Sequence, residues 1–322
     1  MNNFNTIYEN LYQSVDRKIE QLRKKIIATL FLFVSFVVIE LILAHLIKYN
    51  TLSLKCYILS SFLSLIIICI LIIIIKVKVD KYKAIFKETV IKKFISEYDK
   101  YLGYLAKVGI SEQVYKKAEF IENSKWYTRD TMLNFMNAVI EEDRSHYIYS
   151  SKDYIEGKIE GVGFLKMAEV HTYLASITHS DNDMNKHTIF RGLFANIEMS
   201  KSFNNNVYIF STNILKQKIK KTNFKIDINS EEFNQYFDVY TRDKLTVMEI
   251  LTPDILDLLI KYRKKYNIHC DIIIKDKNIY IRFKTGKIFE PRIFKEVLNY
   301  NDLKKYFDII DLIFRISNLL NK

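Results

Sequence analysis

The sequence predicts an α+β protein, in which a two-span transmembrane helical hairpin is followed by a cytoplasmic domain of antiparallel β-hairpins with flanking helices. Two long apolar runs, Ile26–Ile47 and Cys56–Ile75, lie in the first quarter of the 322-residue chain. From Tyr154 onward, short stretches with the alternating pattern of strands dominate. Helical segments stand between and after these stretches, which favours an α+β arrangement over a parallel βαβ sheet.

The two apolar runs predict membrane-spanning helices. About 20 helical residues cross a hydrocarbon core of about 30 Å, and each run reaches that length. Only residues 48–55 separate the runs, so both ends of the hairpin should emerge on the same side of the membrane. Basic residues flank the outer ends and are scarce in the turn. We therefore expect a multi-pass inner-membrane protein with both termini in the cytoplasm.

A secretory signal peptide is the competing interpretation of an N-terminal apolar run. The first run is too long for one, starts late, lacks a small-residue cleavage site and is followed by a second run. We therefore expect both runs, residues 26–47 and 56–75, to remain in the protein as one hairpin over residues 26–75.

The formal net charge is +12, and residues 1–100 carry 15 Lys and Arg against 8 Asp and Glu. The basic excess is densest beside the second span, where four lysines are expected to face lipid head groups: Lys76, Lys78, Lys81 and Lys83. Each basic residue near an anionic lipid surface contributes about 1 kcal/mol of attraction. The rest of the chain has interleaved charge and no basic cluster, so a nucleic-acid partner is not expected.

The segments on either side of the spans predict amphipathic helices. Residues 1–25 have apolar side chains at spacings of three and four and are expected to run straight into the first span. Residues 76–107 repeat the pattern as a juxtamembrane stalk helix. The two could pack together as an antiparallel stalk. Alternatively, the first could lie flat on the lipid, because Lys and Arg flank its apolar face.

Residues 108–322 are expected to form one cytoplasmic α+β domain. Ser111 should cap a helix to Ile121, and Thr252-Pro253 should open another to about Tyr266. Two further helices are expected at Arg129–Arg144 and Asp302–Leu320. The predicted strands are Tyr154–Ile159, Val162–Ile177, His187–Met199, Val207–Ser211, Phe237–Arg242, Val247–Leu251, Cys270–Lys275 and Asn278–Lys284, with turns at Glu160-Gly161 and Asp276-Lys277 and a loop over His179–Lys186.

The three cysteines, Cys56, Cys69 and Cys270, have neither CxxC spacing nor the spacing of a secreted disulfide framework. They are expected to be small buried apolar residues.

Several segments, in their order along the chain, resemble the bacterial domain-of-unknown-function family 3137 (DUF3137). They are Gly109-Ile110-Ser111-Glu112, Glu156 to Gly161, Glu169-Val170-His171, Thr188 to Phe194, Tyr236 to Tyr240, Leu251-Thr252-Pro253 and Phe289-Glu290-Pro291. The resemblance covers roughly residues 80 to 320, but residues 122–152 are longer and more helical than it leads us to expect. The resemblance implies two membrane spans followed by a cytoplasmic domain. The family has no established activity, so no catalytic residue follows from it. It suggests a LemA-type membrane protein as a partner.

Two ionisable residues lie in or near the first span, Glu40 and His45. Counting about seven residues inward from the turn places Glu40 opposite serines of the second span: Ser60, Ser61 and Ser64. A carboxyl group in hydrocarbon is costly unless it is protonated and hydrogen-bonded, so we expect Glu40 to hold the helices together. Proton or ion handling is the alternative, and it would require a homo-oligomer because two helices alone enclose no pathway.

The richest group of potential metal ligands is Glu169, His171, His179 and His187, with Asp181 and Asp183 in the predicted loop. Glu169 and His171 would point to one face of a strand, and His187 would begin the returning strand. A zinc-type site would make the protein a membrane-bound metal-dependent enzyme. We prefer the interpretation that these side chains are solvated polar residues at the tip of a hairpin.

The chain has neither a nucleotide-binding glycine pattern nor the motifs of a nucleophile elbow or a zinc protease. Aromatic residues in strands such as Tyr280 to Phe283 more often pack in a core than stack on bases. The sequence therefore predicts a membrane-anchored binding or adaptor module for a protein or lipid partner, with no cofactor. The metal-dependent enzyme is the alternative.

Overall fold

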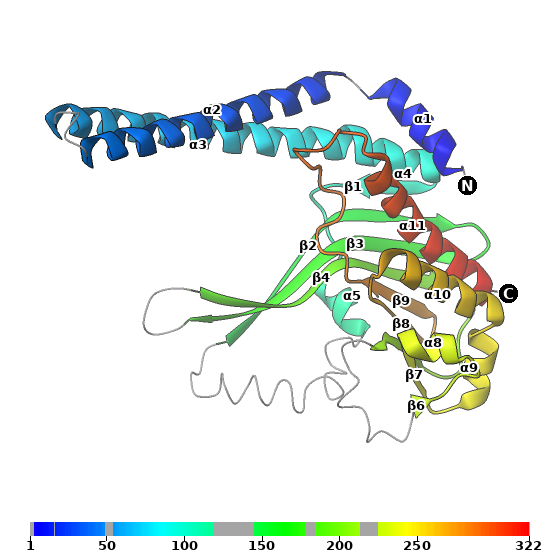
Figure 1. The fold of residues 1–322 in the computed structure, drawn as a ribbon. Coiled ribbons are helices and arrows are strands. Elements are labelled where there is room, and N and C mark those ends of the chain that lie inside the picture. Colours follow the sequence, from blue (N-terminus) through cyan, green and yellow to red (C-terminus); the bar gives the residue numbers. More distant parts are fainter. Residues whose placement is uncertain are drawn as a thin grey trace. The chain divides into compact units, whose positions relative to one another are not determined.

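The computed structural model describes residues 3–15, 17–48, 54–118, 145–177, 184–212 and 225–321 (Figure 1). The chain divides into two compact units. The helical unit comprises Met1–Tyr98 and Phe289–Lys304, and the sheet unit comprises Asp99–Ile288 and Lys305–Lys322.

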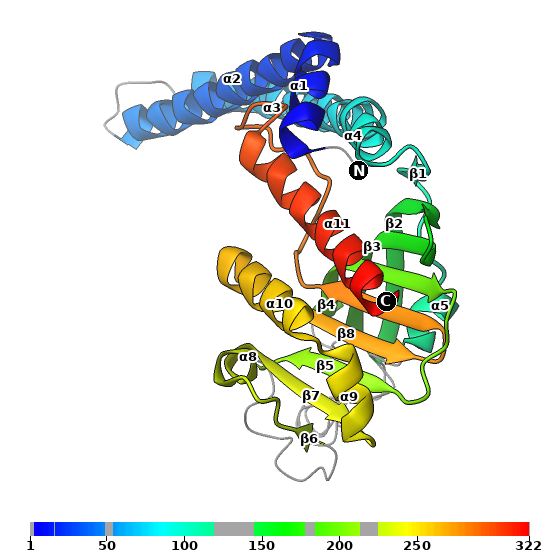
Figure 2. The same cartoon turned by 90° about the vertical axis from the view of Figure 1, so that its right-hand side faces the viewer.

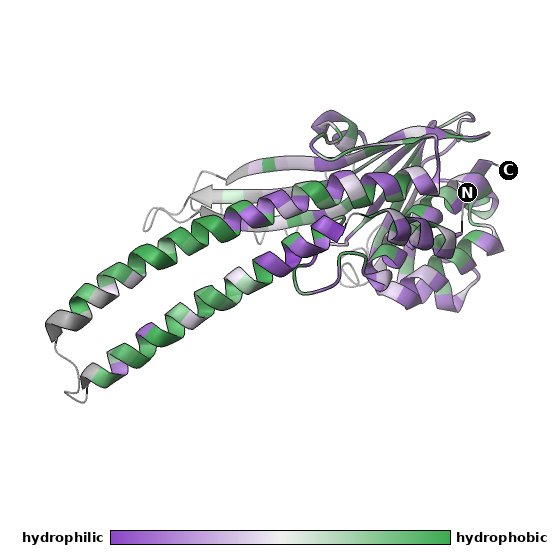
Figure 3. Cartoon of the chain, turned by 90° about the horizontal axis from the view of Figure 1, so that it is seen from above, coloured by the Kyte–Doolittle hydropathy of each residue, from purple (hydrophilic) through white to green (hydrophobic). Residues whose placement is uncertain are grey.

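The helical unit is built around two long helices, α2 (Arg17–Lys48) and α3 (Leu54–Phe86), that pack along each other as a hairpin (Figures 1 and 3). Both are long and apolar enough to cross a membrane. Their outer parts are mostly hydrophobic, with a few polar positions such as Glu40 and His45 on α2, and charged residues return toward the opposite ends (Figure 3). Apolar side chains such as Leu41 and Leu59 are 66% and 73% exposed, which suits lipid as the surrounding medium.

The N-terminal helix α1 (Phe4–Ser14) does not continue into α2, so the prediction of one unbroken helix is wrong. Val15 has an extended backbone, which ends α1. The Ser14 hydroxyl donates to the Asn10 carbonyl at 2.6 Å and so competes with the backbone for that acceptor in the last turn. The apolar side of α1 is buried within the helical unit, where Asn10 Nδ2 donates to Glu97 Oε2 at 2.8 Å. This packing favours the stalk over a helix lying flat on lipid.

The second stalk helix ends earlier than predicted. After α3 the chain forms a π-helical turn, η1 (Lys87–Ile91), and a short helix, α4 (Lys92–Tyr98). The helix cannot continue to residue 107, because the Asp99 carboxylate accepts from the Tyr101 amide in a turn and the next residues form strand β1 (Leu102–Leu105). Burial alternates along β1, as expected for a strand with one covered face.

Residues 289–304 pack within the helical unit beside α1, α2 and η1. Lys87 Nζ lies 3.2 Å from Glu290 Oε1, and both side chains are largely buried. Arg23 donates to the Ile293 carbonyl at 3.0 Å, and the Tyr8 hydroxyl donates to the Leu298 carbonyl at 3.1 Å. These contacts tie a segment near the C-terminus to the helices that precede and follow the apolar hairpin.

The sheet unit contains a nine-stranded antiparallel sheet of order β1-β2-β3-β4-β9-β8-β5-β7-β6. The strands after β1 are β2 (Ser145–Ile159), β3 (Gly163–Ile177), β4 (Met184–Met199), β5 (Val207–Ser211), β6 (Lys225–Ile226), β7 (Phe237–Thr241), β8 (Cys270–Lys275) and β9 (Asn278–Phe283). The two predicted tight turns are confirmed: Gly161 and Asp276 have positive φ values of 72° and 53°.

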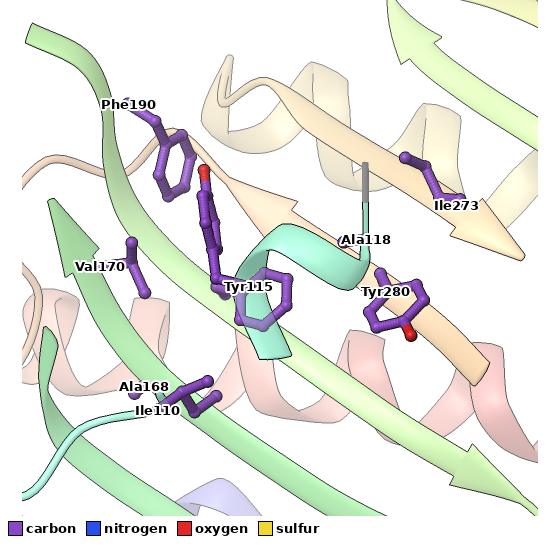
Figure 4. Packing of buried hydrophobic residues seen from close by; sticks show 9 residues of the cluster. Ile110, Tyr115, Ala118, Ala168, Val170, Phe190, Ile273 and Tyr280 are labelled. Atoms are coloured by element: carbon purple, nitrogen blue, oxygen red, sulfur yellow. The ribbon is translucent and has the colours of Figure 1, made fainter. Parts of the chain in front are cut away.

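Helices cover both faces of this sheet. Two long helices, α10 (Pro253–Tyr266) and α11 (Tyr300–Asn321), lie over one face, and α5 (Glu112–Lys117) lies on the other (Figures 2 and 4). The Ser111 hydroxyl caps α5, and Pro253 opens α10, as predicted. A short helix, α8 (Glu231–Tyr236), precedes β7. The predicted α+β fold with antiparallel hairpins is therefore confirmed, whereas the helix expected at Arg129–Arg144 lies outside the described residues.

One predicted strand is a helix in the structure. Residues 244–250 form α9 (Lys244–Ile250), so the strand predicted at Val247–Leu251 is wrong. The Asp243 carboxylate accepts from the backbone amides of Leu245 and Thr246 at 3.1 and 3.3 Å, which starts a helix immediately after β7. The strand prediction followed the apolar residues of this segment and missed the cap.

The core under α5 is aromatic (Figure 4). Tyr115 projects from α5 onto β3 and β4, where its ring lies 5.0 Å from that of Phe194 and 6.2 Å from that of Phe190. Small residues on β3, Ala168 and Val170, make room for these rings. The helices on the opposite face pack against the other set of alternating residues, as in the 5.5 Å contact between the rings of Tyr262 and Phe283.

Candidate functional site

The hairpin changes from apolar to charged at a defined level. Lys78 Nζ of α3 donates to the Thr29 hydroxyl of α2 at 2.9 Å, so residues 29 and 78 stand at similar heights along the hairpin. Beyond this level, toward the connecting turn, both helices are almost entirely apolar. On the other side, α2 carries Arg23, Lys24 and Lys25, and α3 carries Lys81 and Lys83.

The four lysines predicted to face lipid head groups are not equivalent. Lys76 and Lys83 border a groove between α2 and α3. Lys78 is directed to Thr29. Lys81 is exposed and does not line the groove. One sequence cluster thus contains two groove lysines, one lysine that joins the helices and one lysine on the outer surface.

The groove has a volume of about 470 Å³ and a graded lining. Its apolar part is formed by five side chains from both helices: Leu30, Phe33, Ile72, Ile75 and Val79. Its polar part contains Lys76, Asp80 and Lys83, at successive turns of α3. None of these three charged side chains forms an ion pair with any residue that the structure describes. The groove therefore presents two ammonium groups and one carboxylate above an apolar slot.

The polar residues predicted inside the spans lie on both helices. Glu40 is half-buried on α2, and His45 is exposed near the end of that helix. On α3, the Ser64 hydroxyl donates to the Ser61 carbonyl of the preceding turn at 3.0 Å. Within the described residues, neither of these serines bonds to Glu40, and the side chain of Ser60 lies outside them. A direct link from Glu40 to the second helix stays a prediction.

The predicted metal ligands fall on β3, β4 and the segment between them. The Glu169 carboxylate is 3% exposed, and its Oε2 accepts from the Ile288 amide at 3.1 Å. His171 is aligned with Arg191, and His187 is aligned with Leu174, so the two histidines stand several residues apart along the β3–β4 ladder. No three ligand-type side chains converge within the described part of the chain. His179, Asp181, Asp183 and the side chain of His187 lie outside it, so a metal site stays a prediction.

The environment of His171 disfavours its charged form. Partial burial lowers the pKa of His171, and the positive charges of Arg191, Lys186 and Lys287 lower it further. Its Nε2 lies 3.3 Å from the Thr188 hydroxyl. The hydroxyl contact and the ring contact with Tyr173, at 4.9 Å, indicate that His171 packs among its strand neighbours.

Sequence reasoning missed a buried ion pair in the middle of the sheet. Arg282 Nε of β9 lies 2.8 Å from Asp271 Oδ2 of β8, and the side chains are 7% and 12% exposed. The other Asp271 oxygen accepts from the Ser211 amide at 3.0 Å, and the Arg282 guanidinium lies 5.4 Å from the Phe190 ring. The sequence contained a signal for this pair. Asp271 and Arg282 are equally distant from the predicted Asp276-Lys277 turn, so they must face each other across the hairpin.

The hydroxyl groups of Tyr115 and Thr172 are buried near this ion pair, and that of Tyr147 lies near Thr172. Burial raises the pKa of Tyr115, which keeps its hydroxyl protonated at neutral pH, and the nearby charge of Arg282 opposes the shift. These three hydroxyls add polar groups to the face of the sheet under α5.

Comparison of the chain with known protein families supports the resemblance to DUF3137. The family described as "Protein of unknown function (DUF3137)" matches residues 188–322. The match begins at β4, so the quoted segments before Thr188 lie outside it, whereas those around Phe190, Val239, Pro253 and Glu290 lie within it. No curated protein and no solved structure matches the chain.

Proposed function

We propose that this protein is a multi-pass protein of the inner membrane whose hairpin anchors a cytoplasmic α+β domain, and that it acts by binding anionic phospholipid at the cytoplasmic face. The observation that carries the proposal is the charge step along α2 and α3. Two apolar helices end together in basic side chains, at the level of the Lys78–Thr29 hydrogen bond.

The positive-inside rule supports the orientation. Arg17, Lys18, Arg23, Lys24 and Lys25 precede the apolar part of α2, and a similar set follows that of α3, whereas the connecting stretch contains only Lys48 and Lys55. Both chain termini are then cytoplasmic. The sheet unit follows α3 and is accordingly cytoplasmic as well.

The experiment compares the full chain in nanodiscs of zwitterionic lipid with the full chain in nanodiscs containing anionic lipid. We expect a higher melting temperature in the anionic discs at 0.1 M salt, because a ligand that binds only the native state stabilises it. The difference should shrink by 1 M salt, where the Debye length is about 3 Å instead of about 10 Å. Equal melting temperatures at every salt concentration would contradict the proposal.

A metal-dependent enzyme is the competing function, and elemental analysis separates the two. The full chain purified without chelators should contain less than about a tenth of a zinc equivalent. About one zinc per chain that is lost in His171→Ala, with folding retained, would favour the enzyme and the Glu169, His171, His179 and His187 ligand set.

A LemA-type membrane protein is the protein partner that the family resemblance suggests. In vivo crosslinking of the full chain, followed by mass spectrometry, tests this association directly. Enrichment of such a protein over an unrelated two-span membrane protein would support it, and equal recovery would remove it.

A further inference from the structure

We infer that the groove between α2 and α3 binds one phosphatidylglycerol-type lipid, with an acyl chain along the apolar slot and the phosphodiester between Lys76 and Lys83. The inference rests on the proposed function and deepens it, because it assigns a stoichiometric lipid site where the proposal requires only attraction to an anionic surface. The groove is lined by residues of the helical unit alone.

The order of residues along the groove matches the order of groups in a phospholipid. The chain of α3 runs from the connecting turn toward the charged end, so Ile72 and Ile75 are deeper in the apolar zone than Lys76 and Lys83. On α2, which runs the other way, Phe33 is deeper than Leu30. Apolar side chains are therefore available at the depth of an acyl chain, and ammonium groups at the depth of a phosphate.

The length of the groove also fits. Ile72 and Lys83 are eleven residues apart, which corresponds to about 16 Å along an α-helix. That distance spans the head group and the upper part of one acyl chain, within half of a hydrocarbon core of about 30 Å. The rest of the chain would extend along the apolar helix surface toward the turn.

The charges select among phospholipids. Lys76, Lys83 and Asp80 together carry one net positive charge, which one phosphodiester neutralises. A glycerol head group adds hydroxyl donors that can reach the Asp80 carboxylate without adding charge. An ethanolamine head group would add its own positive charge and leave the groove with one uncompensated charge. The groove thus favours phosphatidylglycerol over phosphatidylethanolamine.

Native mass spectrometry of the full chain in mild detergent, with added phosphatidylglycerol or phosphatidylethanolamine, tests this site. Wild type should retain one phosphatidylglycerol per chain, at least about fivefold more than phosphatidylethanolamine. Lys83→Gln should reduce the retained phosphatidylglycerol about fivefold or more. Lys81→Gln removes the same charge two residues away, outside the groove, and should change retention less than twofold.

A second pair of variants tests the apolar slot without a change of charge. Ile72→Trp should fill the slot and displace the lipid. Ile73→Trp places the same ring on the next residue, which is 62% exposed and does not line the groove, and should leave retention unchanged. Melting temperatures of the variants in the same detergent identify any that fail to fold.

The outcomes separate this inference from the proposed function. If Lys81→Gln and Lys83→Gln weaken retention equally, or if the two lipids bind equally, the groove site is wrong while a general attraction to anionic lipid stands. If wild type retains no anionic lipid and its stability does not depend on lipid charge, both are wrong. Selective loss in Lys83→Gln and Ile72→Trp supports the site.

Discussion

Lys78 of α3 donates a hydrogen bond to the Thr29 hydroxyl of α2, which in turn donates to the Lys25 carbonyl at 2.7 Å. The lysine side chain thereby links the two long helices where their apolar parts begin. This bond joins the helices near the level of Lys76 and Lys83, and the packing of α2 against α3 sets the height of these lysines relative to the apolar zone. The lipid site depends on that packing.

The buried Asp271–Arg282 pair should be a major determinant of sheet stability. Asp271→Asn leaves the Arg282 charge without its partner in the interior, which costs about 3–5 kcal/mol. The double variant Asp271→Leu, Arg282→Met removes both charges and should recover much of that loss. Thermal unfolding in detergent, followed by circular dichroism, measures both.

The matched control is the exposed pair of Asp257 and Lys261 on α10, whose side chains are 70% and 78% exposed. Asp257→Asn should change stability by less than about 0.5 kcal/mol, since surface ion pairs contribute little. If Asp271→Asn is as mild as Asp257→Asn, the buried pair does not have the structural role argued above.

Gly192 is required for close approach of β4 to the chain after β9. A Cβ atom at Gly192 would lie 1.9 Å from the Phe283 carbonyl oxygen, whereas one at Gly103 of β1 would meet nothing closer than 3.8 Å. Gly192→Ala should therefore lower the melting temperature by several degrees, and Gly103→Ala should leave it nearly unchanged. Equal effects of the two substitutions would refute the steric argument.

The sequence predicted the regular parts of this fold because their signals are local. The β8–β9 hairpin has alternating residues around a two-residue turn, and α10 has both its Thr252 cap position and Pro253. The errors arose where a side chain overrides the apolar pattern. Asp243 caps a helix, α9, in an apolar segment that reads as a strand, and the turn at Asp99 ends the stalk helix at Tyr98.

The candidate site was predictable only in composition. The lysine cluster after the second span is visible in the sequence, but the groove is not, because it depends on the pairing of Leu30 and Phe33 with distant residues, from Ile72 onward. No local pattern distinguishes Lys83, which borders the groove, from Lys81, which does not. That distinction requires the register of α2 against α3.

Acid should destabilise the sheet unit through His269. Partial burial lowers the pKa of His269 below its ordinary value of 6.5, and the charges of Arg263 and Lys284 add to the shift. The unfolded chain then binds a proton more readily than the folded one, so stability is full above pH 6.5 and falls as the pH drops through and below that value. His269→Gln should reduce the loss of melting temperature between pH 7.5 and pH 5.5. An unchanged loss would show that other groups cause it.

Glu40 should serve the packing of the membrane hairpin and not proton or ion handling. Because a charged carboxylate in hydrocarbon is costly, Glu40→Gln, which keeps hydrogen-bonding capacity without charge, should preserve expression and membrane insertion. Any growth phenotype of a deletion strain should be complemented by this variant as well as by wild type. Normal insertion without complementation would favour proton handling in an oligomer.

Membrane topology is the most direct test of the central claim, that α2 and α3 form a spanning hairpin with both chain termini in the cytoplasm. A periplasm-active reporter is inserted after Asn50 in one fusion and attached after Lys322 in another, each with the full chain. The account predicts activity only for the fusion at Asn50. Activity only at Lys322 would reverse the orientation, and activity at neither position, with the chain recovered in the soluble fraction, would contradict the membrane hairpin itself.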